Sequence, residues 1–233
     1  MAVDAPDGIS LKPLDETSEG SLVDAVYHAL LDAIVSGDIP SGSVLSEVLV
    51  AKQLNVSRTP VHDALRQLAK DGLVDRANGR RARVAGFSAD DIFEIFEMRK
   101  YLEGPATELV AGRMDRRQLG PLREKAASLS SELSAPDWLA NWEEFDQDFR
   151  AAIAEACGNR RLARDIKRYG LLYRGMQRSA TEEMRREALR DYSAVLDAIA
   201  GHDGVAARSA MEHHIAHWQD YFIHRVSPAG RKQ

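Results

Sequence analysis

The sequence predicts a mainly α-helical protein with two domains, a small N-terminal domain of helices and a hairpin followed by an all-helical bundle. At 233 residues the chain is long enough for each domain to bury its own core. Apolar residues recur at helical spacing over most of it, and the clearest change to extended spacing falls between residues 73 and 84. Residues 1–20 are polar and lack periodicity. We therefore expect a disordered tail over 1–20, a first domain over 21–87 and a second over 88–226.

Three helices are expected at the start of the first domain. The first begins at residue 21, and its apolar pattern ends at Gly37. Ser46 is expected to cap a second helix that continues to Leu54, and Ser57 a third that continues to about residue 70. Pro60 is compatible with the third helix because it falls in the first turn.

A hairpin follows the third helix. Residues 73–76 and 82–84 read as two short strands, and the Asn78-Gly79 pair between them is the strongest local signal for a hairpin turn. Asn55 tolerates the left-handed conformation that the turn between the second and third helices needs. With a brief extended piece at 43–45, this order of elements predicts a winged helix-turn-helix.

The third helix is predicted to read DNA. In a helix-turn-helix the second helix of the motif lies in the major groove, with its N-terminal residues against the base edges. Here that helix opens with Ser57, Arg58 and Thr59. A guanidinium can donate to both O6 and N7 of guanine, so Arg58 is expected to read that base, while the two hydroxyls suit phosphate or sugar contacts.

The hairpin adds a second basic element, because four arginines cluster on it. The chain has a net charge of −5, so a DNA-binding surface must be local. Asn78 and Gly79 at the tip are expected to let this wing approach the minor groove or its phosphates. The arginines could instead form only a solvated surface, but their position directly after a helix-turn-helix favours DNA. They are Arg76, Arg80, Arg81 and Arg83.

The segment VSRTPVHDALRQLAKDGLV at 56–74 resembles the signature of the GntR family of regulators, which usually reads VSRTPVREALxxLxxxGLV. The resemblance implies that Arg58, Thr59 and the tip of the wing touch DNA. His62 replaces a second arginine of the recognition helix, and Val48 stands where an arginine often follows the glutamate of the preceding helix. Both changes remove a charged contact, although His62 could still contact a phosphate, more strongly when protonated.

The second domain is predicted to be a bundle of six helices, because no extended pattern occurs after residue 88. Ser88 and Asp91 suggest a capping box at its start, and Gly158 and the segment 201–204 interrupt the helical pattern. The expected helices span 88–113, 115–133, 136–157, 160–178, 181–200 and 205–225.

This domain resembles the FCD domain, the helical sensor of a subfamily of GntR regulators. The resemblance implies ligand sensing and dimerisation, and a repressor that a small metabolite, commonly an organic acid, releases from DNA. It covers about 88–225 and rests on four motifs in the family's order, EMRKYLE at 97–103, FDQDF at 145–149, CGN at 157–159 and AMEHHI at 210–215.

Many FCD domains hold a metal with one aspartate and three histidines, and the resemblance places these ligands at four positions. Asp146 and His214 match the pattern, whereas Arg150 and Tyr192 replace two histidines. A guanidinium repels a dication and cannot be deprotonated, and the two remaining ligands make a poor zinc site. We therefore expect no metal and no other cofactor, with a metal-dependent sensor as the alternative.

Arg150 is expected to supply the missing positive charge directly. It could pair with Asp146 one helical turn away, or with a carboxylate effector. Tyr192 would add a hydroxyl donor, and Arg99 and His214 would complete a polar cluster in an otherwise apolar cavity. An aspartate and an arginine four residues apart are, however, often only a surface ion pair.

Other candidate residues of this domain favour a structural role. His213 and His214 point in different directions on a helix, so a histidine site would need His214 and His217. The single cysteine, Cys157, excludes an intramolecular disulfide and a cysteine-rich zinc site. Core or interface positions are expected for Trp138, Trp142 and Trp218.

Several other classes of protein are excluded or disfavoured. No apolar run approaches the roughly 18 residues that span a bilayer, and no N-terminal signal pattern occurs, so we expect the cytoplasm. No nucleophile elbow, phosphate loop or HExxH motif supports an enzyme, and a protein-interaction module has no use for the arginine-rich hairpin. The expected partners are a pseudo-palindromic DNA operator, a small anionic metabolite and a second copy of the chain.

Overall fold

The computed structural model describes residues 11, 13–14, 21–35, 37–75, 81–86, 88–177 and 180–226. The chain forms two compact units and passes from the first to the second after Gly86. Four residues of the expected wing, Arg76, Asn78, Gly79 and Arg80, lie outside the described residues.

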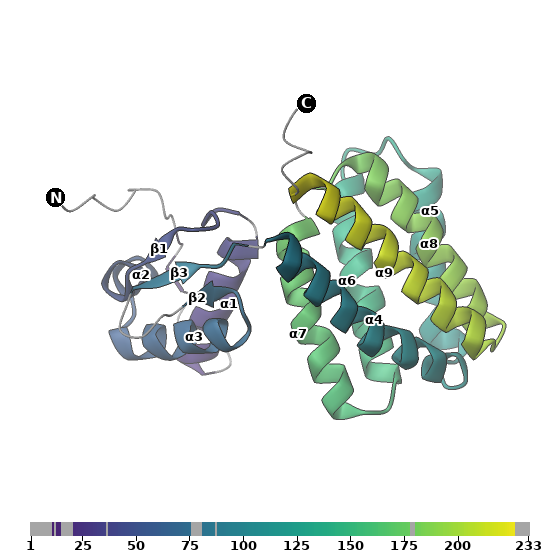
Figure 1. The fold of residues 1–233 in the computed structure, drawn as a ribbon, viewed down its shortest axis with the longest axis horizontal. Helices are drawn as coiled ribbons and strands as arrows, with labels where there is room; N and C mark the ends of the chain where they lie inside the picture. The colour runs from purple at the N-terminus through teal and green to yellow at the C-terminus, as the bar shows by residue number, and fades with distance from the viewer. Residues whose placement is uncertain are drawn as a thin grey trace. The chain divides into compact units, whose positions relative to one another are not determined.

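The N-terminal unit consists of three helices and a small antiparallel sheet (Figure 1). Its elements are α1 (Leu22–Val35), β1 (Val44–Leu45), α2 (Glu47–Leu54), α3 (Arg58–Lys70), β2 (Val74–Asp75) and β3 (Ala82–Val84). The strand order is β1-β3-β2, and the pairs Leu45–Ala82 and Val74–Val84 set the register. This is the predicted winged helix-turn-helix, with α2 and α3 as the helix-turn-helix pair.

The turns of this unit take the expected conformations, whereas the caps differ in part. Asn55, between α2 and α3, has φ 56° and ψ 45°. Gly72, after α3, has φ 82°. Ser46 and Ser57 occupy the N-cap positions of α2 and α3, but neither side chain accepts a capping hydrogen bond, which corrects the prediction. At the exposed Ser57, water can satisfy the first helical amides instead.

Two residues of the expected tail lie against α2. The Leu11 amide donates to Gln53 Oε1 and the Leu14 amide to the Leu54 carbonyl, each at 3.3 Å. The carbonyls at the end of a helix lack intrahelical partners, so the end of α2 provides an acceptor for this segment. The expectation of disorder therefore fails at these two residues, and residues 1–10, 12 and 15–20 lie outside the described residues.

The C-terminal unit is all-helical over the described residues after 88. Each end of its helices lies within two residues of the predicted one. Helix α9 packs against α4 and α8, and Figure 1 shows α4 and α9 side by side. The helices are α4 (Ala89–Ala111), α5 (Arg116–Ser131), α6 (Trp138–Ala156), α7 (Arg160–Gln177), α8 (Glu182–Ala200) and α9 (Gly204–Val226).

Local signals account for most of these helix ends. Ser88 and Asp91 form the predicted capping box at the start of α4. Gly158 takes a positive φ of 75° after α6. Between α8 and α9 the positive φ, 56°, belongs to His202 and not to a glycine. The His202 ring donates from Nδ1 to the Ala111 carbonyl at 2.9 Å, and this tertiary contact stabilises the turn.

Aromatic side chains dominate the core of the helical unit. Trp142 and Trp218 are fully buried with ring centroids 6.2 Å apart, and Trp138 donates from Nε1 to the Leu129 carbonyl. The prediction that the tryptophans belong to the core is therefore confirmed. Cys157 is buried at the end of α6. Over the part of the chain that the structure describes, no helix has the length and apolar character needed to cross a membrane.

Candidate DNA-binding surface and ligand-sensing cluster

Helix α3 has one buried face and one polar, exposed face. The buried face is apolar and consists of Pro60, Val61, Ala64, Leu65 and Leu68. The exposed residues Arg58, His62 and Arg66 follow at spacings of four, with Thr59 next to Arg58. They begin at the N-terminal end, where recognition helices contact base edges. Arg66 was not among the sequence-predicted contacts, although its four-residue spacing from His62 places it on the same face.

Glu47 of α2 links the two basic side chains at the start of this face. His62 Nδ1 donates to Glu47 Oε1 at 2.9 Å, and Arg58 Nη2 lies 3.7 Å from Glu47 Oε2. The side chains of Arg58 and His62 are 69% and 49% exposed. Exposed ion pairs of this kind contribute little to stability, so a phosphate or base can replace Glu47 at small cost.

The remaining sequence-predicted contacts on this unit differ in their surroundings. Arg81 is exposed directly before β3. Arg83, on the central strand β3, is also exposed. Its side chain donates to the carbonyl of Gly42, just before β1, and this contact holds the guanidinium against the sheet. The Val48 side chain is 55% exposed near the start of α2, so it has no role in the core.

The second candidate site is a buried cluster that starts on α6 and α8. Asp146 and Arg150, on successive turns of α6, form an ion pair, and Tyr192 of α8 donates its hydroxyl to the other Asp146 oxygen. The Asp146 and Arg150 side chains are 1% and 8% exposed, so the alternative of a surface ion pair is wrong. Three residues at positions of the family's metal ligands therefore contact one another.

Arg99 of α4 brings a second ion pair into this cluster. Its Nε donates to Glu103 Oε1 at 2.6 Å, and both side chains are almost completely buried. The ring centroid of Tyr173, on α7, lies 4.0 Å from Arg99 Cζ and 4.3 Å from Arg150 Cζ. Burial raises the pKa of Tyr173 to about 12, against the lowering influence of both arginines, so its hydroxyl stays protonated.

Neither Glu103 nor Tyr173 was among the sequence-predicted site residues. The four-residue spacing between Arg99 and Glu103 was a usable signal for an ion pair on one helix face. Tyr173 had no comparable signal, because its contacts with the arginines join three separate helices.

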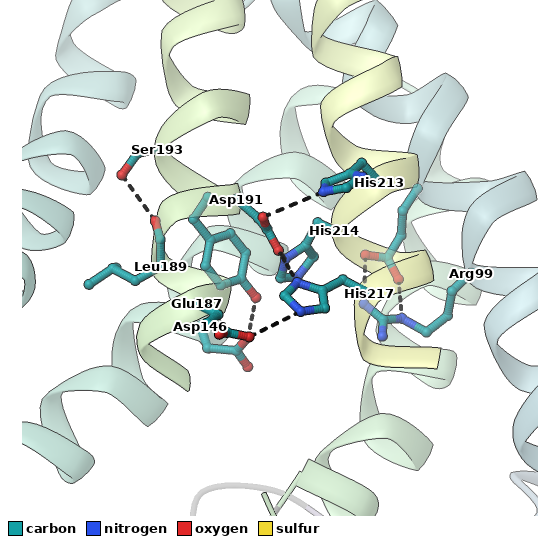
Figure 2. A network of polar contacts seen from close by, with 11 residues as sticks. Arg99, Asp146, Glu187, Leu189, Asp191, Ser193, His213, His214 and His217 are labelled. Carbon is teal, nitrogen blue, oxygen red and sulfur yellow. Dashed lines mark hydrogen bonds and ion pairs between the residues drawn. The ribbon is translucent and has the colours of Figure 1, made fainter. Parts of the chain in front are cut away.

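His214 of α9 completes the cluster. Its ring centroid lies 4.2 Å from that of Tyr192, and its Nδ1 lies 3.6 Å from Asp191 Oδ2. Asp191 also accepts a hydrogen bond from His217 at 3.0 Å, and Figure 2 shows Asp191 among the histidines of α9. The His213 side chain is 74% exposed, whereas that of His214 is buried, so the two point in different directions as predicted.

Burial sets the protonation state of His214. It lowers the pKa of His214 to about 4, with Arg99 and Arg150 acting in the same direction and Asp191 acting against them. The imidazole is therefore neutral at pH 7. The formal charges of the cluster balance, because Glu103 matches Arg99 and Asp146 matches Arg150.

The five sequence-predicted ligand residues thus come together, but they do not line an open cavity. Each of Arg99, Asp146, Arg150, Tyr192 and His214 is at most 7% exposed. They pack against one another and against Tyr173, so the apolar cavity expected around them stays a prediction. A ligand can reach them only after side chains move.

The cluster does not fit the metal that the family resemblance implies. Both Asp146 oxygens are already engaged, one by Arg150 and one by Tyr192. The Arg150 guanidinium has no lone pair to offer a cation and repels it. Over the described residues, no group of three or more His, Cys, Asp or Glu side chains is arranged to hold a metal ion.

The neutral state of His214 predicts a pH-dependent stability. Its pKa is about 4 in the folded protein and near 6.5 in the unfolded chain, so the unfolded chain binds the additional proton between these values. The contribution of His214 is therefore complete above pH 6.5 and is lost as the pH falls towards 4. Between pH 7 and pH 5 we expect it to lower the free energy of unfolding by about 2 kcal/mol.

Urea titrations followed by tryptophan fluorescence measure this effect, because all three tryptophans lie in the helical unit. The variant His214→Gln removes the titrating group and serves as the control. The parent should lose more stability than the variant between the two pH values. Equal losses in both proteins would show that burial does not hold His214 neutral.

Comparison with known families identifies both units. Residues 22–84 match the model of the bacterial regulatory proteins of the gntR family, and residues 94–217 match the model of the FCD domain. The second match alone covers more than half of the chain. The chain belongs to the GntR family. It is a DNA-binding transcription regulator with an FCD effector domain, and not an enzyme.

Individual relatives of this GntR regulator agree with that assignment. An HTH-type transcriptional regulator of Agrobacterium vitis is 33% identical over 147 residues, which cover 60% of this chain and 86% of that protein. The probable D-xylose utilization operon transcriptional repressor of Paenarthrobacter nicotinovorans is 26% identical over 208 residues, covering 87% of this chain and 91% of that protein. The structure of E. coli McbR/YncC shares the fold, with a TM-score of 0.72 at 22% identity over 87% of this chain and 99% of that one.

Proposed function

We propose that this GntR regulator is a cytoplasmic repressor that a small organic acid releases from DNA. It binds as a homodimer to a pseudo-palindromic operator, and each recognition helix reads one half-site. The exposed start of α3 carries this proposal, because Arg58, Thr59 and His62 lie there on a helix whose opposite face is buried. Repression is supported by the name of the P. nicotinovorans relative, a probable operon repressor.

Replacing Arg58 tests the proposed docking of α3. We expect Arg58→Ala to weaken operator binding by about 1–3 kcal/mol and to relax the base preference at one position of each half-site, because a bidentate guanine contact is lost. Gel shifts at two salt concentrations, with DNA from upstream of the protein's own gene, measure both effects.

The double variant Arg80→Ala, Arg81→Ala shows how loss of general DNA binding differs from the loss of specific binding expected for Arg58→Ala. Removing charges from the wing should weaken binding to all sequences alike and flatten the salt dependence, since phosphate contacts carry no sequence information. An Arg58→Ala protein with the parent's operator affinity and base preference would show that α3 does not dock in this way.

Arg150 is the proposed anchor for the effector. A buried charge needs a partner, and Asp146 now fills that role. An effector carboxylate that replaces Asp146 offers the guanidinium the same planar two-oxygen acceptor. The displaced Asp146 carboxyl group must then take up a proton or reach water, because its charge has lost its buried partner. Tyr192, which now donates to Asp146, can donate to the incoming carboxylate, with Arg99 and His214 close by.

The exchange at Arg150 changes how α6 and α8 are joined, because the contact between Asp146 and Tyr192 links these helices. An effector controls DNA binding only if its affinity differs between the two arrangements of the protein. In this proposal the arrangement with the effector at Arg150 is the one that does not fit the operator.

We propose that this sensor works without a metal ion. Arg150 and Tyr192 at two ligand positions support this, because neither side chain is suited to hold zinc at neutral pH. Elemental analysis of the protein, purified without chelators, is expected to find far less than one zinc, nickel or manganese per chain. Retention of about one such ion per chain would contradict the proposal.

The proposed dimer uses the exposed face of α4. Met98, Tyr101 and Leu109 are 38%, 68% and 43% exposed and fall on one side of the helix, while α4 packs against α9. A row of exposed apolar side chains marks an interaction surface more often than isolated ones do. A second copy of the chain covers such a row symmetrically, because a two-fold axis pairs the same surface with itself.

A further inference from the structure

The helical unit contains an open cavity that is separate from the buried cluster. Its volume is about 760 Å³, and it lies between the start of α5, the turn before it and the end of α8. This volume is within the range of small-molecule sites, roughly 300–1,000 Å³. None of the five residues proposed for the Arg150 site lines it.

Gly120, inside α5, leaves part of this cavity open. A Cβ atom at Gly120 would meet no atom within 4 Å. Two other helical glycines have closer neighbours, since a Cβ at Gly104 would lie 2.8 Å from Glu212 Oε1 and one at Gly204 would lie 3.1 Å from the Glu108 carbonyl oxygen. Glycine inside a helix is destabilising relative to alanine, and neither φ nor packing requires it at Gly120.

The cavity combines an apolar floor with a cationic rim. Met114, Leu119 and Ile199 line it and are at most 5% exposed. Arg116 and Arg123 stand two turns apart on the same face of α5. Their charged groups can therefore act on the same bound anion.

The positive charge of this rim is available to a ligand. Arg116 has no ion-pair partner among the described residues, and Arg123 pairs with Asp197 at 2.6 Å. The Arg123 and Asp197 side chains are 50% and 65% exposed, so an anion can replace Asp197 at small cost. Asp115, the one acidic lining residue, caps α5 by accepting hydrogen bonds from the amides of residues 117 and 118.

We propose that this cavity is a second ligand site of the protein and that it binds a carboxylate with an apolar body. The carboxylate pairs with Arg116 and Arg123, and the apolar body covers Leu119 and Ile199 in the space beside Gly120. Such a ligand contacts both α5 and α8 and stabilises their packing. It does not require the side-chain movements that access to Arg150 requires.

Isothermal titration calorimetry of the full chain with 4-phenylbutanoate tests this site, with the uncharged 4-phenylbutanamide as the matched compound. The parent should bind the acid saturably and the amide at least about tenfold more weakly, because a charge-assisted contact is lost. Gly120→Leu, which places a side chain in the space proposed for the apolar body, should weaken binding of the acid about tenfold or more, and so should Arg116→Gln combined with Arg123→Gln. Gly120→Ala should bind within about twofold of the parent, because a methyl group leaves most of the cavity open.

Thermal unfolding of the same proteins separates loss of the site from loss of the fold. Gly120→Ala and Gly120→Leu should melt no lower than the parent, since both replace a helical glycine and meet open space. A lower melting temperature for Gly120→Leu would show that the space is not open and would overturn the proposal. No saturable binding to the parent, unchanged binding to Gly120→Leu, or equal binding of acid and amide would also overturn it. Binding that persists in Gly120→Leu but is lost when Arg150 and Asp146 are neutralised would assign the ligand to the buried cluster instead.

Discussion

Replacing Tyr101 and Leu109 by glutamate is expected to convert the protein into a monomer and to lower its operator affinity by about 100-fold or more. Both side chains are exposed on one face of α4, so the new charges remain hydrated in a monomer. In a two-fold dimer the same charges would be buried against their copies and would repel each other. A monomer also loses the high effective concentration with which the second recognition helix of a dimer meets its half-site.

Light scattering during gel filtration measures the first effect, and fluorescence anisotropy with labelled operator measures the second. The parent should have twice the 25.8 kDa mass of one chain, and the variant the mass of one chain. Val205→Glu is the matched control, because Val205 is 75% exposed at the start of α9 and lies outside the α4 row. A Tyr101→Glu, Leu109→Glu protein that keeps the mass of a dimer and the parent's affinity would place the interface on another surface.

Joint replacement of Arg150 by Gln and Asp146 by Asn is expected to give a repressor that binds its operator but no longer responds to its effector. A single replacement would leave the partner's charge buried and uncompensated, at a cost of about 3–5 kcal/mol. The double variant avoids this cost, because it replaces both charges with neutral hydrogen-bonding groups. The winged helix-turn-helix is unchanged, so operator affinity should equal that of the parent and repression in the cell should be permanent.

Most of the fold could be predicted because its signals are local in the sequence. The capping box of Ser88 and Asp91 and the left-handed Asn55 each depend on residues within a few positions. The turn at His202 shows where this reasoning ends. The positive φ there is stabilised by a hydrogen bond to Ala111, which is 91 residues away in the sequence.

The ligand cluster could be predicted only in part, for a similar reason. The four-residue spacing of Asp146 and Arg150 predicted their contact, and the family pattern brought Tyr192 and His214 to the same place. Burial was not predictable from spacing, since it depends on four helices closing around the ion pair. The contact of Tyr173 with both arginines has no sequence signal for the same reason.

The cavity beside Gly120 lay beyond sequence reasoning altogether. A glycine inside a helix can mark close packing, as at Gly104, or open space, as at Gly120, and only the positions of neighbouring atoms distinguish the two. The spacing of Arg116 and Arg123 shows a charged helix face, which is usually just solvated.

Release of DNA by a carboxylate bound at Arg150 is best tested by anisotropy of labelled operator bound to the full chain. A panel of mono-, di- and tricarboxylates, each paired with its amide, is titrated into operator complexes of three proteins. These are the parent, the double variant Arg150→Gln, Asp146→Asn and the double variant Arg208→Gln, Glu212→Gln. The last pair neutralises an exposed i,i+4 ion pair on α9 and is the matched control. At least one carboxylate, but not its amide, should release DNA from the parent and the control, while the Arg150 variant stays bound at the same concentration. Release from the Arg150 variant at the parent's effector concentration, or release by uncharged compounds alone, would contradict the proposed sensing mechanism.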